Sequence, residues 1–395
     1  ASNNVAVGFE SLCKNTTGTC NVAVGKGALK ANLTTSENTA VGTNSLNGNT
    51  GSCNTGVGAS ALENNTGDNN TAVGRRALYL NTSGSGNTAV GRLTLDANTT
   101  AAENTAMGNS ALGSTTTGGS NSAFGSSALV ANTTGATNVA VGIEALTANT
   151  TASDNVAVGS CALKCNTTGA NNIAVGARAL CTVTTGIKNI AIGTEALRYN
   201  TGSNNTAIGY LSLDANTTAS SNTAVGESSL GANTTGVENV AIGASAGAAN
   251  TTGNLNTFVG RDAGQNNTTA GNNTFVGERA GQANTTGDES VAVGQFAYAA
   301  NTTGVDNVAI GRSALSANTT ASNNTAVGRA ALGANTTGTA NTAMGSLASD
   351  AMTTGENNVS VGYLSLSANT TGEKNTAIGS NALRSTTTGP NNTGV

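Results

Sequence analysis

The chain has 395 residues, of which only 9% are charged, and it carries a net charge of −4 with no histidine. Such a composition excludes the basic surface that nucleic-acid binding requires. The single proline excludes proline-rich linkers, and collagen is excluded because it needs Gly at every third residue, which this chain lacks. No apolar run is long enough for a membrane span or a signal peptide.

One short pattern fills the sequence. A typical copy begins at Asn138-Val-Ala-Val-Gly142 and ends at Asp154, and the next copy begins at Asn155. Numbered from that first Asn, each of the 23 copies has Gly at place 5, and the copies are spaced by 17 residues or, three times, by 16. A fixed short period is typical of solenoids. The sequence therefore predicts an all-β parallel β-solenoid, one continuous array over residues 1–395 with about 23 coils of 16–17 residues.

Each coil contains two apolar segments. Places 1 to 5 predict a short strand, because β-branched residues alternate with Ala and the segment ends at Gly. Places 7 to 11, such as Glu144-Ala-Leu-Thr-Ala148, form a second segment that has Leu at place 9 in 18 copies. This segment is too short to hold a helix. We therefore expect two strands and two turns in each coil.

Charge is confined to a few places. Of the 36 charged residues, 35 fall at places 6, 7, 10, 16 and 17, and the exception is Lys14 at place 11. Because charged side chains are almost never fully buried without partners, these places are expected to face water.

Asn forms two columns, at place 1 in 22 copies and at place 12 in 19 copies. Asn suits tight turns, and stacked Asn side chains can hydrogen-bond from one coil to the next. We interpret both columns as structural. The alternative is glycan attachment, because 16 Asn residues at place 12, including Asn98 and Asn132, head an Asn-x-Thr/Ser sequon.

In one region, side-chain volume is lost at place 9 and gained at place 3. Leu at place 9 becomes Gly247, Gly264 and Gly281, while Ala at place 3 becomes Phe258 and Phe275 in the last two of those coils. Dense interiors require lost volume to be replaced, so we infer that places 3 and 9 lie close together. A ligand-binding aromatic site is the rival explanation.

Both sides of the predicted first strand are uncharged. Places 2 and 4 point one way and place 3 the other, so one side can fill the coil and the other side requires a neighbouring chain. The shared side is either that of place 3, as at Ala140, or that of Val139 at place 2. The exchange between Phe258 and Gly264 favours the second version, since it places Ala140 inside its own coil.

The repeat resembles a known family. The stretch Asn21-Val-Ala-Val-Gly-Lys-Gly-Ala28 and its copies are similar to the head repeats of trimeric autotransporter adhesins of the YadA type. This resemblance covers all 395 residues, although the adhesin repeat is shorter. It implies a left-handed β-roll and a homotrimeric fibre. Similar arrays occur in phage tail-fibre-like proteins and in large secreted bacterial repeat proteins.

No chemistry is predicted. With no histidine the commonest general base is missing, and the neighbours Asp288 and Glu289 fit a solvated turn better than a catalytic pair. We therefore expect no enzyme, and we assign no catalytic, cofactor-binding or metal-binding residue. Of the six cysteines, Cys165 and Cys181 lie on successive coils and are the only plausible disulfide pair.

These patterns favour a structural or adhesive fibre shaft that is extracellular or on the cell surface. Its expected partners are its own copies, as a homotrimer or an end-to-end filament, and host-cell or abiotic surfaces or glycans. No contact with nucleic acid or membrane is expected in this segment. The alternative is a viral tail or head fibre. Because the first copy is entered at Ala1 without Met and the last stops at Val395 before its Gly, we expect a segment of a longer protein.

Overall fold

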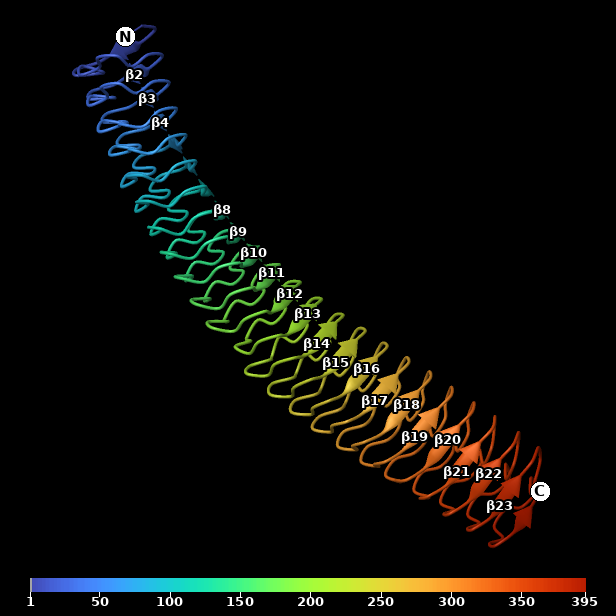
Figure 1. Cartoon of the computed structure of the whole chain (residues 1–395). Coiled ribbons are helices and arrows are strands. Elements are labelled where there is room, and N and C mark those ends of the chain that lie inside the picture. The colour runs from blue at the N-terminus through green and yellow to red at the C-terminus, as the bar shows by residue number, and fades with distance from the viewer. Residues whose placement is uncertain (1) are drawn as a thin grey trace. The chain divides into compact units, whose positions relative to one another are not determined.

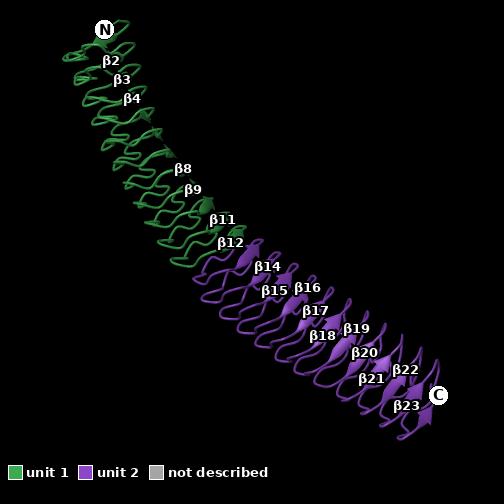
Figure 2. Ribbon diagram, viewed as in Figure 1, with its two compact units in different colours: residues 1–195 green, residues 196–395 purple. Residues whose placement is uncertain are grey.

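The computed structural model describes residues 2–395 and shows an all-β parallel β-solenoid of about 23 turns, as the period predicts. No helix occurs among the described residues. The chain divides into two compact units, Ala1–Glu195 and Ala196–Val395 (Figure 2). Each unit stacks its strands along one side and its turns along the others (Figure 1).

In unit 1 each strand pairs in parallel with the next, and equal places face each other. Ala140 lies opposite Ala157, for example. The strands are β1 Val5–Val7, β2 Val22–Val24, β3 Thr39–Val41, β4 Thr55–Val57, β5 Thr71–Val73, β6 Thr88–Val90, β7 Thr105–Met107, β8 Ser122–Phe124, β9 Val139–Val141, β10 Val156–Val158, β11 Ile173–Val175 and β12 Ile190–Ile192.

Unit 2 repeats this arrangement, with parallel pairing from each strand to the next. Phe258 lies opposite Phe275, for example. The strands are β13 Thr206–Ile208, β14 Thr223–Val225, β15 Val240–Ile242, β16 Thr257–Val259, β17 Thr274–Val276, β18 Val291–Val293, β19 Val308–Ile310, β20 Thr325–Val327, β21 Thr342–Met344, β22 Val359–Val361, β23 Thr376–Ile378 and β24 Thr393–Gly394.

The predicted second strand is wrong, because places 6 to 11 form turns. Glu144 at place 7 has a φ of 58° and Leu146 at place 9 a φ of 51°, which is left-handed backbone that no extended strand can contain. These turns direct both Ala145 and Leu146 inward, and neither has any exposed surface. Coils still bond to one another here, since the N–H of Leu146 donates to the carbonyl of Ala162 at 3.0 Å.

Gly at place 5 ends each strand where neighbouring coils approach most closely. Gly142 has a φ of +137°, and a Cβ added to it would lie 2.5 Å from the carbonyl oxygen of Gly159 in the next coil. Only Gly combines that φ with so little space. The constant Gly is therefore required by the contact between coils.

The interior of each coil is small. Ala at places 3 and 8, Leu at place 9 and the Asn residues at places 1 and 12 are buried, as Ala140, Ala145, Leu146 and Asn149 illustrate. Ala140 has no exposed surface within a single chain. The version of the shared face that used Ala140 is therefore wrong, because place 3 fills the chain's own core.

The inferred proximity of places 3 and 9 is confirmed. A Cβ on Gly247 would lie 2.6 Å from the Phe258 ring, and a Cβ on Gly264 would collide with the same ring. The rings of Phe258 and Phe275 are fully buried with centroids 5.6 Å apart. No pocket opens among residues 2–395. These aromatic residues therefore pack the core, and the rival ligand site receives no support.

Tyr298 explains the one coil that lacks Asn at place 1. In other coils this Asn donates its amide to the carbonyl at place 15, as Asn273 does to Gly287 at 2.9 Å. Ser290 is too short to do so, and the Tyr298 hydroxyl donates to the equivalent carbonyl of Gly304 at 2.9 Å. This exchange was not predicted from the sequence, although Tyr298 and Ser290 are both exceptions in the same copy.

Candidate functional surface

The outward side of each strand carries no charge. It consists of the side chains at places 2 and 4, and we call it the strand face. Place 2 holds Thr, Ser, Val or Ile in every strand, and place 4 holds Val, Ile, Met or Phe. Many place-4 side chains remain between 36% and 48% exposed, namely Val41, Val73, Met107, Phe124, Val141, Ile192, Ile208, Ile242, Val293, Ile310, Met344 and Ile378. An apolar side chain at place 4 of every coil, exposed in these coils and half-buried in most of the others, forms a row that is unusual for a chain that works alone.

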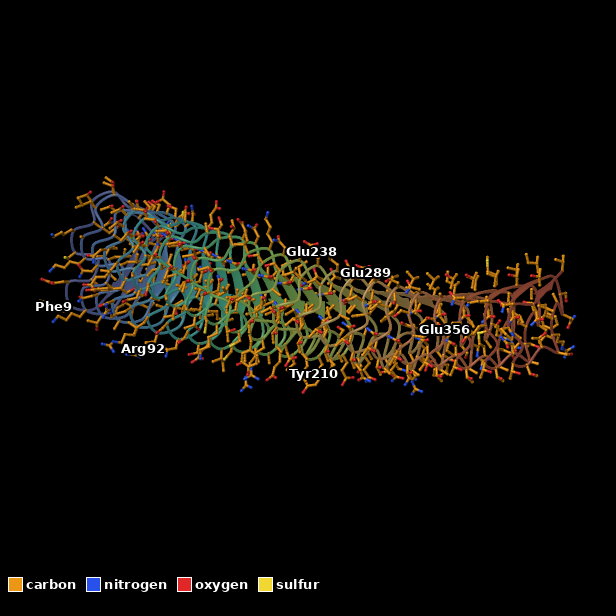
Figure 3. All side chains as sticks on the ribbon, turned by 90° about the horizontal axis from the view of Figure 1, so that it is seen from below. Phe9, Arg92, Tyr210, Glu238, Glu289 and Glu356 are labelled. Atoms are coloured by element: carbon orange, nitrogen blue, oxygen red, sulfur yellow. The ribbon has the colours of Figure 1, made fainter. Side chains whose placement is uncertain are left out.

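Two borders flank the strand face. Places 16 and 17 precede each strand and place 6 follows it. Figure 3 shows this for unit 2, where Tyr210 at place 6 lies on the opposite side of the ribbon from Glu238 and Glu289 at place 17. Tyr210, Glu238 and Glu289 are all exposed. The strand face is thus an uncharged strip between two solvent-facing rows.

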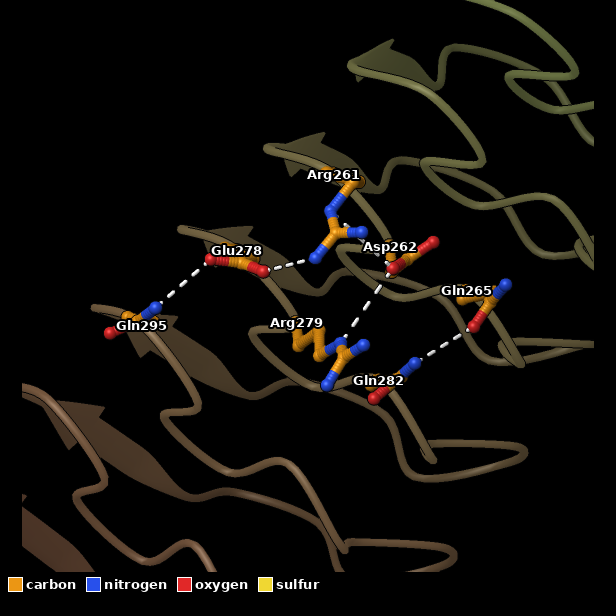
Figure 4. Close-up of polar contacts among 7 residues, drawn as sticks. All are labelled: Arg261, Asp262, Gln265, Glu278, Arg279, Gln282 and Gln295. Carbon is orange, nitrogen blue, oxygen red and sulfur yellow. Dashed lines mark hydrogen bonds and ion pairs between the residues drawn. The ribbon is translucent and has the colours of Figure 1, made fainter.

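At places 6 and 7, polar side chains connect successive coils. Around β16 to β18, Arg261 pairs with Glu278, which accepts a hydrogen bond from Gln295 at 2.9 Å. Beside this row Arg279 lies 3.7 Å from Asp262 (Figure 4). Each contact joins a place in one coil to the same place in the next.

A second pattern joins place 7 to place 10 of the following coil. Lys164 Nζ lies 2.7 Å from Glu144, and Lys30 Nζ lies 2.6 Å from Glu10. The hydrogen bond from Lys164 lowers the pKa of the Glu144 carboxyl. In these pairs, opposite charges at places 7 and 10 are matched within the chain.

The Asn columns form two buried ladders, as the structural interpretation predicts. Asn149 donates to the side-chain oxygen of Asn132 at 2.9 Å and to the carbonyl of Ala152 at 3.0 Å. The sequon residues Asn98 and Asn132 have no exposed surface, and their amide groups donate within the fold. Glycan attachment at these residues is incompatible with the folded coils, because the amide nitrogen that would carry the glycan is buried and hydrogen-bonded.

Interruptions of the place-12 ladder leave unpaired acceptors. Among the described residues, the Oδ1 atoms of Asn98, Asn166 and Asn335 are buried without a hydrogen-bond partner. In each case the next coil has a residue other than Asn at place 12, namely Thr115, Val183 and Met352. The ladder therefore depends on continuity, since each Asn satisfies the one before it.

The remaining candidates show no catalytic arrangement. No group of three or more His, Cys, Asp or Glu residues suited to a metal ion occurs in residues 2–395, and no helix there has the length and apolarity needed to cross a membrane. Asp288 and Glu289 are exposed. Cys165 is a free thiol, so the plausible bond to Cys181 does not form in this structure.

Comparison with known proteins finds no family that matches the sequence and no curated protein similar to it. The resemblance to the adhesin head repeats therefore rests on the repeat pattern alone.

Proposed function

We propose that the chain forms the shaft of an extracellular structural and adhesive fibre, in which copies of the chain associate through the strand face. The observation that supports this proposal best is the uncharged, partly exposed strand face, which recurs from β2 to β23 in every coil. The number of copies is three by the resemblance to trimeric adhesins. Place 2, as at Val139, then lines the shared axis.

The small interior gives a physical reason for association. Each coil encloses little more than one Leu and two Ala residues between its Asn ladders, as Leu146, Ala140 and Ala145 illustrate. Ordering a whole coil of backbone costs much conformational entropy. Covering Val139 and Val141 on each copy adds apolar burial that one chain lacks. An interface repeated along the array is expected to be large, symmetric and obligate.

The ladders suit a mechanical role. Successive coils are joined by strand pairing, by bonds such as Leu146 N–H to Ala162, and by the amide of Asn149. A load along the array is then shared among several parallel bonds at every step. The exposed positions outside the strand face vary from coil to coil, and we propose that they meet surfaces or glycans.

The native mass tests this proposal. Light scattering is expected to give three times the 38.2 kDa chain mass for the unaltered protein. Val141→Glu together with Val158→Glu places charge on the strand face of two adjacent coils and is expected to give single chains. The control, Thr151→Glu with Thr168→Glu, adds the same charge at exposed turn positions of the same coils and is expected to keep the assembled mass. A single-chain mass for the unaltered protein would refute the proposal.

Adhesion is tested with beads that carry the purified protein. Beads coated with the assembled shaft are expected to resist detachment by flow from cells or mineral surfaces better than beads coated with the Val141→Glu, Val158→Glu variant. Equal retention of the two would mean that the shaft is structural but not adhesive.

A further inference from the structure

Charge is divided unequally between the two borders of the strand face. Places 16 and 17, which we call the acidic border, hold ten acidic residues and only two basic ones, Lys188 and Lys374. The acidic residues are Glu37, Asp68, Glu103 and Asp154 in unit 1, and Glu238, Asp288, Glu289, Asp306, Glu356 and Glu373 in unit 2.

Place 6, which we call the basic border, has the opposite charge. It holds six basic residues and only two acidic ones, Glu227 and Glu278. The basic residues are Lys26, Arg75 and Arg92 in unit 1, and Arg261, Arg312 and Arg329 in unit 2. Each unit therefore has one border of each sign along the same uncharged strip.

These charges are not matched within the chain. Among residues 2–395, no carboxylate of the acidic border takes part in an ion pair. On the basic border only Arg261 is paired, with Glu278 and Asp262. Arg75, Arg312 and the other unpaired residues of this border are exposed. This differs from places 7 and 10, where opposite charges already meet in pairs such as Lys164 with Glu144.

We propose that the two borders recognise each other between copies of this chain, so that the acidic border of one copy lies against the basic border of the next. This inference rests on the proposed association through the strand face and adds its direction. Copies related by rotation about an axis parallel to the array place opposite borders together. Antiparallel copies, related by a twofold axis across the array, place acid against acid and base against base. The charge pattern therefore selects parallel association.

The register of the charges agrees with parallel copies. Asp306 and Arg312 flank the same strand, β19, and Asp68 and Arg75 flank β5. When two copies lie parallel and in register, Arg312 of one copy is therefore level with Asp306 of the next. Antiparallel copies would offer Arg312 no acidic border at all. Such rim charges mainly set the rate and specificity of association, while the apolar strip provides most of its free energy.

The direct test reverses the basic border at two levels. Arg75→Glu with Arg312→Glu is compared with Lys14→Glu and Arg384→Glu, which make the same change of charge at places 10 and 11, away from the strand face. After refolding from denaturant at low salt, the border variant is expected to assemble at least tenfold more slowly than the control variant. The difference is expected to shrink at high salt, because surface charges are screened over about 8 Å at physiological ionic strength.

A variant with reversed charges on the acidic border tests whether assembly can be restored. Asp68→Arg with Asp306→Arg makes the other border basic at the same levels, and this variant is also expected to assemble slowly alone. Mixed with Arg75→Glu, Arg312→Glu, it is expected to form mixed assemblies faster than either variant forms assemblies alone, although more slowly than the unaltered chain, because a ring of three that contains both variants keeps one interface between like charges. Failure of the mixture to assemble faster than either variant would overturn the inference.

Cross-linking tests the direction. Cys53 is exposed at place 17 and precedes β4, and Ala59 is exposed at place 6 and follows β4, so parallel copies that pair border to border bring Cys53 of one copy level with position 59 of the next. In the Ala59→Cys variant, a short bifunctional thiol reagent is expected to join Cys53 of one copy to the thiol introduced at position 59 of the next. If assemblies of the expected mass form without this cross-link, the border pairing is refuted and the proposed function stands. The same holds if the border and control variants assemble at equal rates. A single-chain mass would refute the proposed function itself.

Discussion

Asn149→Ala interrupts the buried place-12 ladder in the middle of unit 1. The substitution removes the bonds from Asn149 Nδ2 to Asn132 Oδ1 and to the Ala152 carbonyl, at 2.9 and 3.0 Å. It also removes the acceptor of the Asn166 amide, which lies 3.1 Å from Asn149 Oδ1. A net contribution of about 0.5–1.5 kcal/mol per bond, with buried groups left unpaired, gives a loss of about 2–4 kcal/mol.

Hydrogen exchange measured by mass spectrometry suits this prediction, because solenoids open locally and a single unfolding midpoint averages over many coils. Amides of the coils around Asn149 are expected to exchange roughly 30- to 1,000-fold faster, which corresponds to that free energy. Thr151→Ala changes an exposed side chain in the same turn and is expected to alter exchange by less than about threefold. Equal exchange in the two variants would show that the ladder contributes nothing to stability.

Three further predictions address the core. In thermal melts, Leu146→Asp is expected to lower the free energy of unfolding by more than about 4 kcal/mol and Thr147→Asp by less than about 1 kcal/mol, since only Leu146 is fully buried. Similar losses would contradict the inward orientation of Leu146. Thr115→Asn is expected to raise stability by about 1 kcal/mol in the same assay, because it offers a donor to the unpaired Oδ1 of Asn98; no gain would mean that the interrupted ladder is already satisfied. Burial raises the pKa of the Tyr298 hydroxyl, so its stabilising contribution is complete below its ordinary pKa of about 10 and is lost at higher pH. Melting temperatures between pH 9 and 11 should therefore fall more steeply for the unaltered chain than for Tyr298→Phe, and parallel curves would contradict this.

Much of the coil could be predicted from the sequence because each place has one physical requirement. The confinement of charge predicted which places face solvent, and the exchange between Phe258 and Gly264 predicted that places 3 and 9 meet in the core. The Asn columns predicted ladders such as that of Asn149 and Asn132. These inferences succeeded because repetition averages out the variation of single copies.

The turns at places 6 to 11 could not be predicted, because no particular amino-acid composition marks a segment in which alternate residues have left-handed backbone. Leu146 would favour a strand or a helix by propensity, yet it adopts a φ of 51°, since the bonds between coils and the burial of Ala145 and Leu146 outweigh local preference. Tyr298 was missed for a similar reason. Its role depends on the carbonyl of Gly304, and that proximity exists only in the folded coil.

Methionine oxidation shows whether copies of the chain cover one another's strand faces. The chain has three methionines. Met107 and Met344 lie on the strand face and are 48% and 46% exposed in the single chain, whereas Met352 is fully buried in the core. In the native protein treated with hydrogen peroxide, all three are expected to oxidise slowly, and Met107 and Met344 are expected to become reactive in the Val141→Glu, Val158→Glu variant. Rapid oxidation of Met107 and Met344 in the native protein, with Met352 protected, would show that the strand face is open and that copies do not associate through it.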